Sequence, residues 1–345
     1  MADRKAETIA IVGGGYIGSH VCRALESLGF QVVIADNWSS GTRRRVAGRR
    51  AITVDIADPG SVNNLETAFH RYAVTGVIHL AGLKDVAASF DRPDAFTQTN
   101  TQGTAHLLEA MKRVGVTNLV FSSTAAVYAP SPTGYVVESD PCHPASPYGL
   151  SKWRAEELIS RACSNWGLNA AALRYFNVAG TAKVELAEPH GTNVIPSMLE
   201  RVLAGWPPII FGNDHPTPDG TCVRGYIHVS DLAAAHGAVL TRLPPGFTIF
   251  NVGTRHGTSI SELAQTVRQV TGSSEPAQYR APRHATATCR SGSPTPPHFV
   301  PLWAGGQSTT FAKWFSPNGR RCKVPLRTPV VVKRLEFWHP GHPQM

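Results

Sequence analysis

The sequence lacks any run of about 18 apolar residues, so we expect no segment that crosses a membrane as a helix. Its first residues, MADRKAE, have no apolar signal region, and we expect a cytoplasmic protein without a membrane partner. The six cysteines are scattered, and no two of them form a CxxC pair. This spacing predicts neither a zinc site nor a disulfide framework, so no metal ion is expected.

Acidic residues are nearly absent from the end of the chain. Residues 284–345 hold 8 Lys and Arg and one acid, Glu336, whereas residues 1–283 hold 25 Lys and Arg and 23 Asp and Glu. The formal net charge of +9 therefore consists of +7 from the tail and +2 from the rest. Because the main body is nearly neutral, we expect no nucleic-acid partner, although tryptophans in a basic tail could stack on bases.

The first part of the chain has the pattern of a dinucleotide-binding unit. The apolar stretch TIAIV at 8–12 precedes clustered glycines, a helix-like segment and a second apolar stretch, QVVIAD at 31–36. Such a turn lets a pyrophosphate approach the backbone at a helix N-terminus. Asp36 follows Gly18 at the distance at which an acid holds a ribose hydroxyl, which favours NAD over NADP. The arginines at 43–45 could meet a 2′-phosphate, but a solvated loop explains them better.

Strand-like and helix-like stretches alternate beyond this unit. We expect strands at 51–55, 75–82 and 117–123, with helices at 60–73 and 93–114. This alternation predicts an α/β fold with a doubly wound parallel sheet, which is a Rossmann fold. Such sheets bind ligands beyond the carboxyl ends of their strands. The side chains expected there are Asp55, Ala81, Gly82, Lys84, Ser122, Ser123 and Thr124.

Tyr148 and Lys152 lie four residues apart in the stretch SPYGLSK. Ser146 and Pro147 predict the start of a helix, and Gly167 predicts its end. Positions four residues apart share a helix face, so the phenol and the ammonium should point to the same place. We expect the ammonium to lower the pKa of the phenol, which would make Tyr148 a proton acceptor for an alcohol. Taken alone, a surface tyrosine beside a solvated lysine is the commoner explanation of such a pair.

Several longer motifs follow one another in the chain, namely GGGYIGSH, DNWSSG, HLAGLKDV, FSSTAAVY, SPYGLSK, RYFNVAG and FGNDHPTPDGTCVRGYIHVSDLA. Over residues 8–283 they resemble the UDP-glucose 4-epimerases of the extended short-chain dehydrogenase/reductase family. The resemblance implies an isomerase of galactose metabolism that keeps NAD bound and interconverts UDP-galactose and UDP-glucose through a 4-keto sugar. Tyr148 would take the proton of the sugar 4-hydroxyl while a hydride passes to NAD and later returns.

The resemblance also implies which positions form the site. The catalytic residues would be Thr124, Tyr148 and Lys152. The cofactor-binding residues would be Gly13, Gly15, Tyr16, Ile17, Gly18, Asp36, Asn37, Asp55, Ile56, Ala81, Gly82, Lys84, Asn100, Ser122, Tyr148, Lys152 and Phe176. The substrate-binding residues would be Lys84, Thr124, Asn177, Asn193, Phe211 and Arg224. A homodimer would form through the helices near 93–114 and 148–166.

The expected organisation has three parts. Residues 1–180 would form the NAD-binding Rossmann domain, and residues 181–283 would form a nucleotide-sugar lobe. Residues 226–240 would return to the larger domain as a helix. The segment 284–345 matches no part of the family pattern and holds nine prolines and one acid. A frameshift near codon 284 explains it best, and a divergent, partly disordered tail is the alternative.

Three departures from the family pattern keep other functions open. The glycine turn is one residue shorter than usual, Gly225 stands where an acid is usual, and His284 stands where a second arginine is usual. A nucleotide-sugar 4,6-dehydratase is disfavoured because Ala125 and Ala126, which follow Thr124, cannot move a proton. An epimerase for UDP-N-acetylglucosamine or a UDP-pentose remains an alternative, as does an NAD-binding protein inactivated by its aberrant C-terminus.

Overall fold

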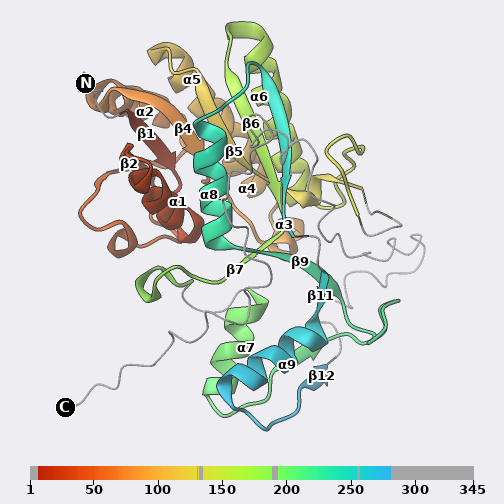
Figure 1. The fold of residues 1–345 in the computed structure, drawn as a ribbon. Helices are drawn as coiled ribbons and strands as arrows, with labels where there is room; N and C mark the ends of the chain where they lie inside the picture. The colour runs from red at the N-terminus through yellow and green to blue at the C-terminus, as the bar shows by residue number, and fades with distance from the viewer. Residues whose placement is uncertain (1–6, 130, 132–134, 189–192, 255–256, 281–345) are drawn as a thin grey trace, which may run out of the picture.

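The computed structural model describes residues 7–129, 131, 135–188, 193–254 and 257–280. A seven-stranded sheet in the order β10-β6-β5-β4-β1-β2-β3 dominates it, and all neighbouring strands run parallel (Figure 1). These strands are β1 (Thr8–Val12), β2 (Gln31–Asp36), β3 (Arg50–Thr53), β4 (Val74–His79), β5 (Asn118–Thr124), β6 (Asn169–Tyr175) and β10 (Phe247–Val252). The prediction of a doubly wound parallel sheet is confirmed.

Helices pack on both faces of this sheet. One face carries α1 (Tyr16–Ser27) and α8 (Val229–Leu240), and the other carries α2 (Ser61–Tyr72), α5 (Gly103–Val114) and α6 (Pro147–Trp166). A strand covered on both sides must be apolar at consecutive positions, and all five residues of β1 are indeed buried. The short helices are η1 (Arg43–Val46), α3 (Val86–Asp91), η3 (Ala125–Val127) and η4 (Val184–Leu186).

The helix predicted at 93–114 is interrupted. Its first residues form α4 (Pro93–Phe96), and a π-helical segment, η2 (Thr97–Gln102), separates α4 from α5. Asn100 lies in the π-helical segment and donates from Nδ2 to the Leu83 carbonyl at 3.0 Å and to Ser151 Oγ at 2.9 Å. The wider turn therefore joins the loop after β4 to helix α6.

A smaller lobe lies below the sheet in Figure 1, where α7 (Val194–Leu203) packs against α9 (Ile260–Thr271). Its strands are β7 (Asn177–Ala179), β8 (Ile209–Phe211), β9 (Val223–His228), β11 (Gly257–Ser259) and β12 (Gln278–Arg280). Two expectations for residues 181–283 need correction. Residues 226–228 belong to strand β9 and not to the returning helix. Strand β10 belongs to the large sheet, where it pairs with β6 at the edge and its Phe250 is buried in the core.

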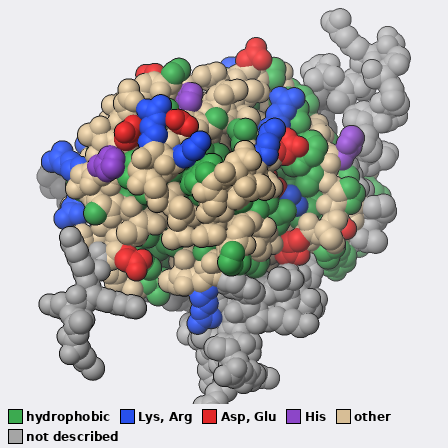
Figure 2. All heavy atoms as spheres, turned by 90° about the horizontal axis from the view of Figure 1, so that it is seen from above, with side chains coloured by type: hydrophobic (Ala, Val, Ile, Leu, Met, Phe, Trp, Pro, Cys, Tyr) green, Lys and Arg blue, Asp and Glu red, His purple; other side chains and the backbone are tan. Residues whose placement is uncertain are grey.

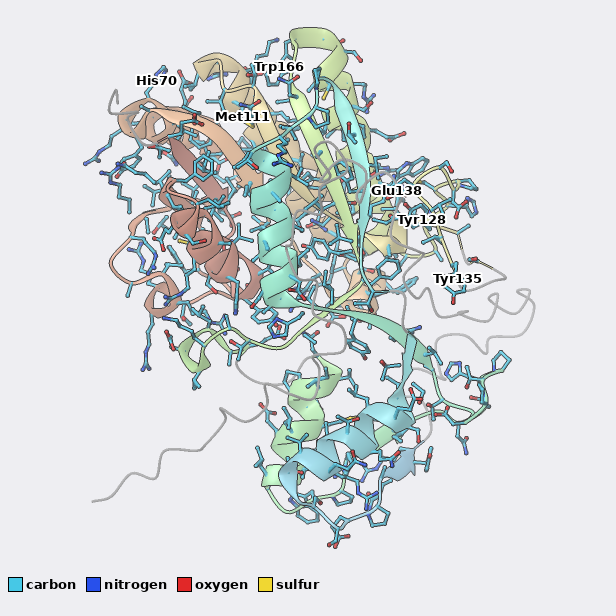
Figure 3. All side chains as sticks on the ribbon, viewed as in Figure 1. His70, Met111, Tyr128, Tyr135, Glu138 and Trp166 are labelled. Atoms are coloured by element: carbon cyan, nitrogen blue, oxygen red, sulfur yellow. The ribbon has the colours of Figure 1, made fainter. Side chains whose placement is uncertain are left out.

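The loop between β5 and α6 is tied to the edge strand β10. Tyr128 donates from its hydroxyl to Asn251 Oδ1 at 2.7 Å, and the Asn251 backbone N–H donates to Glu138 Oε1 at 2.9 Å. Figure 3 shows Tyr128 and Glu138 on the same side of the molecule, beside the end of β10. These bonds hold the loop that leads into α6.

Charges of both signs alternate on the face seen from above in Figure 2, which is the end of the large sheet away from the smaller lobe. In the part of the chain that the structure describes, no helix combines the length and the apolar character needed to cross a bilayer. The segment 284–345, with the predicted frameshift or disorder, lies outside the described residues.

Candidate active site

Helix α6 begins and ends where the sequence predicted. Ser146 Oγ accepts a hydrogen bond from the Gly149 N–H at 3.1 Å, and Pro147 is the first helical residue. Gly167 ends the helix in a left-handed conformation with φ of 77°. This cap fixes the first turn of α6, so Tyr148 and Lys152 have a defined orientation above the strand ends.

Lys152 is buried, with 4% of its surface exposed. Its Nζ donates to the Ser122 carbonyl at 3.0 Å and lies 4.9 Å from the centre of the Phe121 ring. Burial lowers the pKa of Lys152 to about 8, and the Glu156 carboxylate opposes this change. Gly82 allows the close approach of the ammonium, because a Cβ at Gly82 would lie 3.1 Å from Nζ.

Tyr148 and Thr124 both line the cavity described below, and the Tyr148 ring meets Phe96 edge-on at 6.3 Å. The expected effect of Lys152 on its pKa is wrong for this structure. Burial raises the pKa of Tyr148, and the opposing influence comes from Thr124. Desolvation of the phenolate outweighs the influence of Thr124, so the neutral phenol is the stable form.

A cavity of about 850 Å³ opens where the two lobes meet. It brings together many of the residues that the sequence predicted, which are Tyr16, Ile17, Gly82, Lys84, Ser122, Thr124, Tyr148, Lys152, Phe176, Asn177, Asn193 and Arg224. The other predicted residues do not line it, and these are Gly13, Gly15, Gly18, Asp36, Asn37, Asp55, Ile56, Ala81, Asn100 and Phe211. Phe211 ends β8, which pairs with β12 in the smaller lobe, and its side chain is exposed.

The glycine turn lies next to this cavity, between β1 and α1. A Cβ at Gly18 would come within 1.9 Å of the Gly13 carbonyl oxygen, so the turn can close only around a glycine there. A Cβ at Gly15 would meet nothing within 4 Å, and no side chain among the described residues caps α1. The turn is thus open at the helix N-terminus, which fits the pyrophosphate of a dinucleotide.

Polar groups at the ends of β2 and β3 continue the site away from the cavity. The Asp36 carboxylate accepts from the N–H groups of Gly14 at 2.6 Å and Trp38 at 2.5 Å. Asn37 donates from Nδ2 to Asp55 Oδ2 at 3.1 Å. These groups lie at one edge of the sheet, where an adenosine could lie in line with the turn. These polar groups at the ends of β2 and β3 therefore fit the adenosine part of NAD.

Sequence reasoning missed Glu188, which lines the cavity. Its carboxylate accepts from Lys84 Nζ at 2.7 Å and from Asn193 Nδ2 at 2.5 Å. It links two predicted substrate-binding residues across the cleft. Glu188 lies in irregular backbone near η4, so no periodicity in the sequence could have singled it out.

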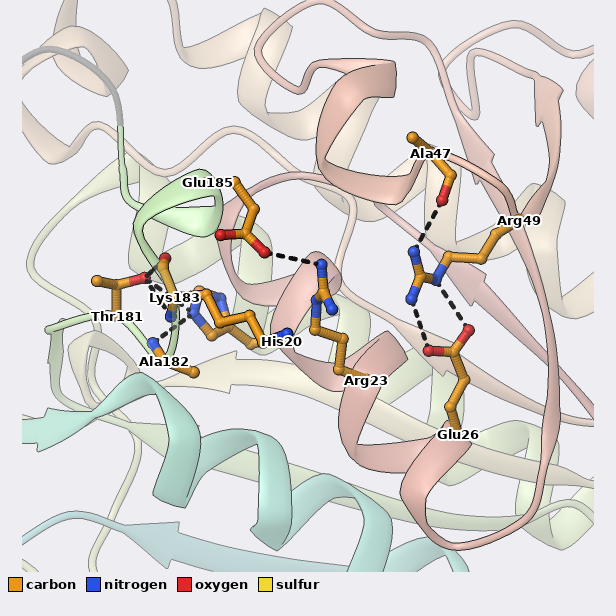
Figure 4. Close-up of polar contacts among 9 residues, drawn as sticks. All are labelled: His20, Arg23, Glu26, Ala47, Arg49, Thr181, Ala182, Lys183 and Glu185. Carbon is orange, nitrogen blue, oxygen red and sulfur yellow. Dashed lines mark hydrogen bonds and ion pairs between the residues drawn. The ribbon is translucent and has the colours of Figure 1, made fainter. Parts of the chain in front are cut away.

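The segment that carries Glu188 is attached to helix α1. His20 Nε2 accepts from the Ala182 N–H at 3.2 Å, and Arg23 forms an ion pair of 3.4 Å with Glu185 (Figure 4). Tyr16, at the first turn of α1, donates from its hydroxyl to the Gly180 carbonyl at 2.5 Å. The cofactor turn and the substrate side of the cavity are therefore connected through one stretch of chain.

The fold and the site define a dinucleotide-binding α/β protein with a tyrosine and a lysine one helical turn apart. The NAD dependent epimerase/dehydratase family model matches residues 9–253, and the chain belongs to that family. UDP-glucose 4-epimerase of Lacticaseibacillus casei is 41% identical over 346 residues, which cover 98% of this chain and 98% of that protein. The enzyme of the same name from Streptomyces lividans is 40% identical over 336 residues, which cover 96% and 95%.

A solved structure agrees with these sequence relatives. The UDP-glucose 4-epimerase from Brucella ovis, in complex with NAD, is similar to this chain with a TM-score of 0.77 and 34% identity. The similarity covers 89% of this chain and 92% of that chain. The alignments with the Lacticaseibacillus and Streptomyces proteins also reach into residues 284–345, beyond the motifs that carry the sequence resemblance.

Proposed function

We propose that the protein is an NAD-dependent isomerase that interconverts UDP-galactose and UDP-glucose. The observation that carries this proposal is the cavity that holds Thr124, Tyr148 and Lys152 between the cofactor turn and the smaller lobe. The family of this chain is NAD dependent, and the relatives described above are named UDP-glucose 4-epimerases. Their names favour UDP-glucose over N-acetylated or pentose substrates.

The cofactor-binding residues are assigned from the resemblance and from their places at the strand ends. Gly13, Gly15 and Gly18 would hold the pyrophosphate of NAD, with Asp36 and Asn37 at the adenosine ribose. Asp55 and Ile56 would border the adenine, and Lys84, Asn100 and Phe176 would lie along the rest of the cofactor. NAD bound by these residues would supply a hydride acceptor for the chemistry at Tyr148.

The proton chemistry belongs to the chain itself. Tyr148 takes the proton from the sugar 4-hydroxyl and later returns it, while Thr124 holds that hydroxyl and the phenol in line. Because the phenol is neutral by preference, its ionisation needs positive charge in the closed site, and Lys152 supplies a buried ammonium one helical turn away. The 4-keto sugar then rotates within the site before it is reduced on its opposite face.

The UDP group serves as the handle that stays in place during this rotation. Arg224 lines the cavity, and its planar guanidinium suits a diphosphate. Asn177 and Asn193 line the same wall, with Asn177 Nδ2 donating to the Gly225 carbonyl at 3.1 Å. A 4,6-dehydratase is not supported, since Ala125 lines the cavity next to Thr124 and cannot move a proton.

The larger organisation is proposed from the same assignments. Residues 1–180 without β7, together with α8 and β10, would form the cofactor domain, and β7 with the remainder of 181–283 would form the nucleotide-sugar lobe. We place the protein in the cytoplasm as a homodimer that associates through the helices α5 and α6. Light scattering coupled to size exclusion tests the dimer, and a monomeric mass at micromolar concentration contradicts it.

Incubation of the purified protein with UDP-galactose, without added NAD, tests the proposed function. Proton NMR should show UDP-glucose appearing until the two sugars reach a constant ratio. UDP-N-acetylgalactosamine and a UDP-pentose, tested in parallel, should turn over more slowly. A protein that carries NAD but converts none of the nucleotide sugars would instead be a non-catalytic NAD-binding protein.

A further inference from the structure

Helix α6 carries a third polar residue on the face of Tyr148 and Lys152. Glu156 follows Lys152 by four residues and Tyr148 by eight, so the three side chains lie along one side of the helix. Glu156 is 3% exposed and Lys152 is 4% exposed. A carboxylate and an ammonium are thus buried one helical turn apart, and each would be costly to bury alone.

The Glu156 carboxylate is fixed by two neighbouring strands. It accepts from Arg174 Nε at 3.0 Å and Arg174 Nη2 at 2.5 Å, both from strand β6. It also accepts a short hydrogen bond from Ser123 Oγ on strand β5. Arg174 in turn lies over the ring of Tyr128, with Cζ 4.7 Å from its centre. The carboxylate therefore cannot turn away from the interior without breaking this set.

The other groups around Lys152 do not help it to hold its proton. On β4, burial and the charge of Lys152 lower the pKa of His79 to about 3, so His79 is neutral. On β6, Tyr175 bonds to Ser122 and burial raises its pKa, so it too is neutral. Arg174 is a cation. Among the described groups, Glu156 is the one carboxylate that favours the charged form of Lys152.

We propose that Glu156 is a positioning residue that keeps the Lys152 ammonium charged at neutral pH, with Arg174 and Ser123 holding its carboxylate in place. The inference rests on the proposed function, because that function makes the charge of Lys152 necessary for proton transfer at Tyr148. Without Glu156, Lys152 loses its proton at a lower pH. The turnover then falls at a lower pH than in the native protein.

The test is a titration of Lys152 by NMR in the full chain labelled with ¹³Cε-lysine, using Lys152→Met to identify the signal. The midpoint in the native protein is expected near 8. In Glu156→Gln it should fall by about 1 pH unit, since Glu156 is the opposite charge that favours the protonated form of Lys152 and a nearby opposite charge shifts a pKa by about 1–3 units. Glu157→Gln is the matched control, because Glu157 is the neighbouring acid and is exposed.

Glu156→Gln leaves the Arg174 charge buried without its partner, and this alone can unfold a protein. The double variant Glu156→Gln/Arg174→Met removes both charges and should fold, with a Lys152 midpoint below the native value but above that of Glu156→Gln, because the Arg174 cation is lost as well. In each variant the descending alkaline limb of turnover should move to lower pH by the same amount as the Lys152 midpoint. An unchanged midpoint in the double variant overturns the inference.

The two proposals fail in different ways. The Lys152 titration does not need turnover, so it tests Glu156 even if no UDP-sugar is converted. If UDP-galactose is converted but the midpoint stays unchanged in Glu156→Gln, the proposed function stands and the role of Glu156 does not. A midpoint that also falls in Glu157→Gln would mean that any acid on this part of α6 has the effect.

Discussion

At the scale of single residues, the site consists of buried polar groups whose bonds leave little freedom. The Lys152 ammonium is held by the Ser122 carbonyl, and the Tyr148 ring packs edge-on against Phe96. Asn100 is bonded to both the N–H and the carbonyl of Leu83. Reactive groups are therefore held in place before the substrate arrives, which is the condition for effective proton transfer.

Replacement of the phenol tests the acid–base role directly. Tyr148→Phe removes the hydroxyl but keeps the ring against Phe96, so the fold should persist. Turnover of UDP-galactose should fall by about 10²-fold or more, the range that a general acid–base contributes. Tyr279→Phe, at an exposed position in β12, should keep the native rate. A Tyr148→Phe protein with near-native turnover would show that another group moves the proton.

A side chain at Gly82 should disturb the site through two neighbours. The Cβ of Gly82→Ala would lie 2.7 Å from Asn100 Oδ1, which already accepts from the Leu83 N–H at 2.8 Å. We expect a loss of about 1–3 kcal/mol in the free energy of unfolding, typical of overpacking, with lower turnover. Urea denaturation and the UDP-galactose assay measure both effects. Gly60→Ala, at the exposed N-cap of α2, should keep the native turnover.

Sequence reasoning singled out Thr124, Tyr148 and Lys152, which line one cavity, but it did not predict all of their physical states. The spacing of Tyr148 and Lys152 correctly predicted a shared helix face, because that follows from helix geometry alone. It predicted the wrong direction for the pKa of Tyr148, because burial depends on β5 and the strand ends, which only the folded chain brings together. Glu156 could have been noticed from its i+4 spacing, whereas Glu188 could not.

At the scale of elements, helix α6 is the part on which the site depends most. Its cap residue Ser146 and its first residue Pro147 determine the turn that carries Tyr148. These signals are local in sequence and were predicted correctly. The break at η2 was not predicted, because Asn100 leaves the helical ladder for partners in the loop after β4 and in α6. Tertiary hydrogen bonds of this kind leave no periodic trace in the sequence.

Removal of the α6 cap should weaken the whole fold by a modest amount. Ser146→Ala leaves the Gly149 N–H without its acceptor, and a lost N-cap costs about 1 kcal/mol. The free energy of unfolding in urea should fall by that amount, while Ser164→Ala, near the exposed end of the same helix, should have little effect. Equal losses in the two variants would mean that the cap does not determine the stability of α6.

At the scale of the whole molecule, the cavity exists because two lobes meet at the carboxyl ends of the sheet. The large sheet could be predicted from apolar stretches that alternate with helical segments, since strands buried on both faces must be apolar throughout. The return of β10 to its edge could not be predicted. Its pairing with β6 joins residues far apart in the chain, and a short apolar stretch does not reveal its partner.

Two buried histidines should make the stability of the molecule depend on pH. Burial lowers the pKa of His79 to about 3 and that of His236 to about 4. Below about pH 6.5 the unfolded chain binds protons that the folded chain does not. The free energy of unfolding therefore decreases as the pH is lowered, by about 1.4 kcal/mol per pH unit for each histidine. The loss ends near pH 4 for His236 and near pH 3 for His79.

Urea denaturation between pH 6 and 4.5 measures this dependence. In His236→Gln the slope of the free energy of unfolding against pH should be smaller by about 1.4 kcal/mol per pH unit. His70→Gln is the control, because His70 is exposed at the end of α2 (Figure 3). An unchanged slope in His236→Gln would show that His236 binds its proton equally well in the folded and unfolded chains.

The fate of the hydrogen at C4 of the sugar tests the central claim most directly. Purified protein is incubated in ordinary water with UDP-galactose that carries deuterium at C4, and no NAD is added. If one hydride leaves and returns within the same closed site, the UDP-glucose formed keeps its deuterium at C4. If the deuterium is replaced by hydrogen from the solvent, or if no UDP-glucose forms, the proposed chemistry at Tyr148 and Lys152 is wrong.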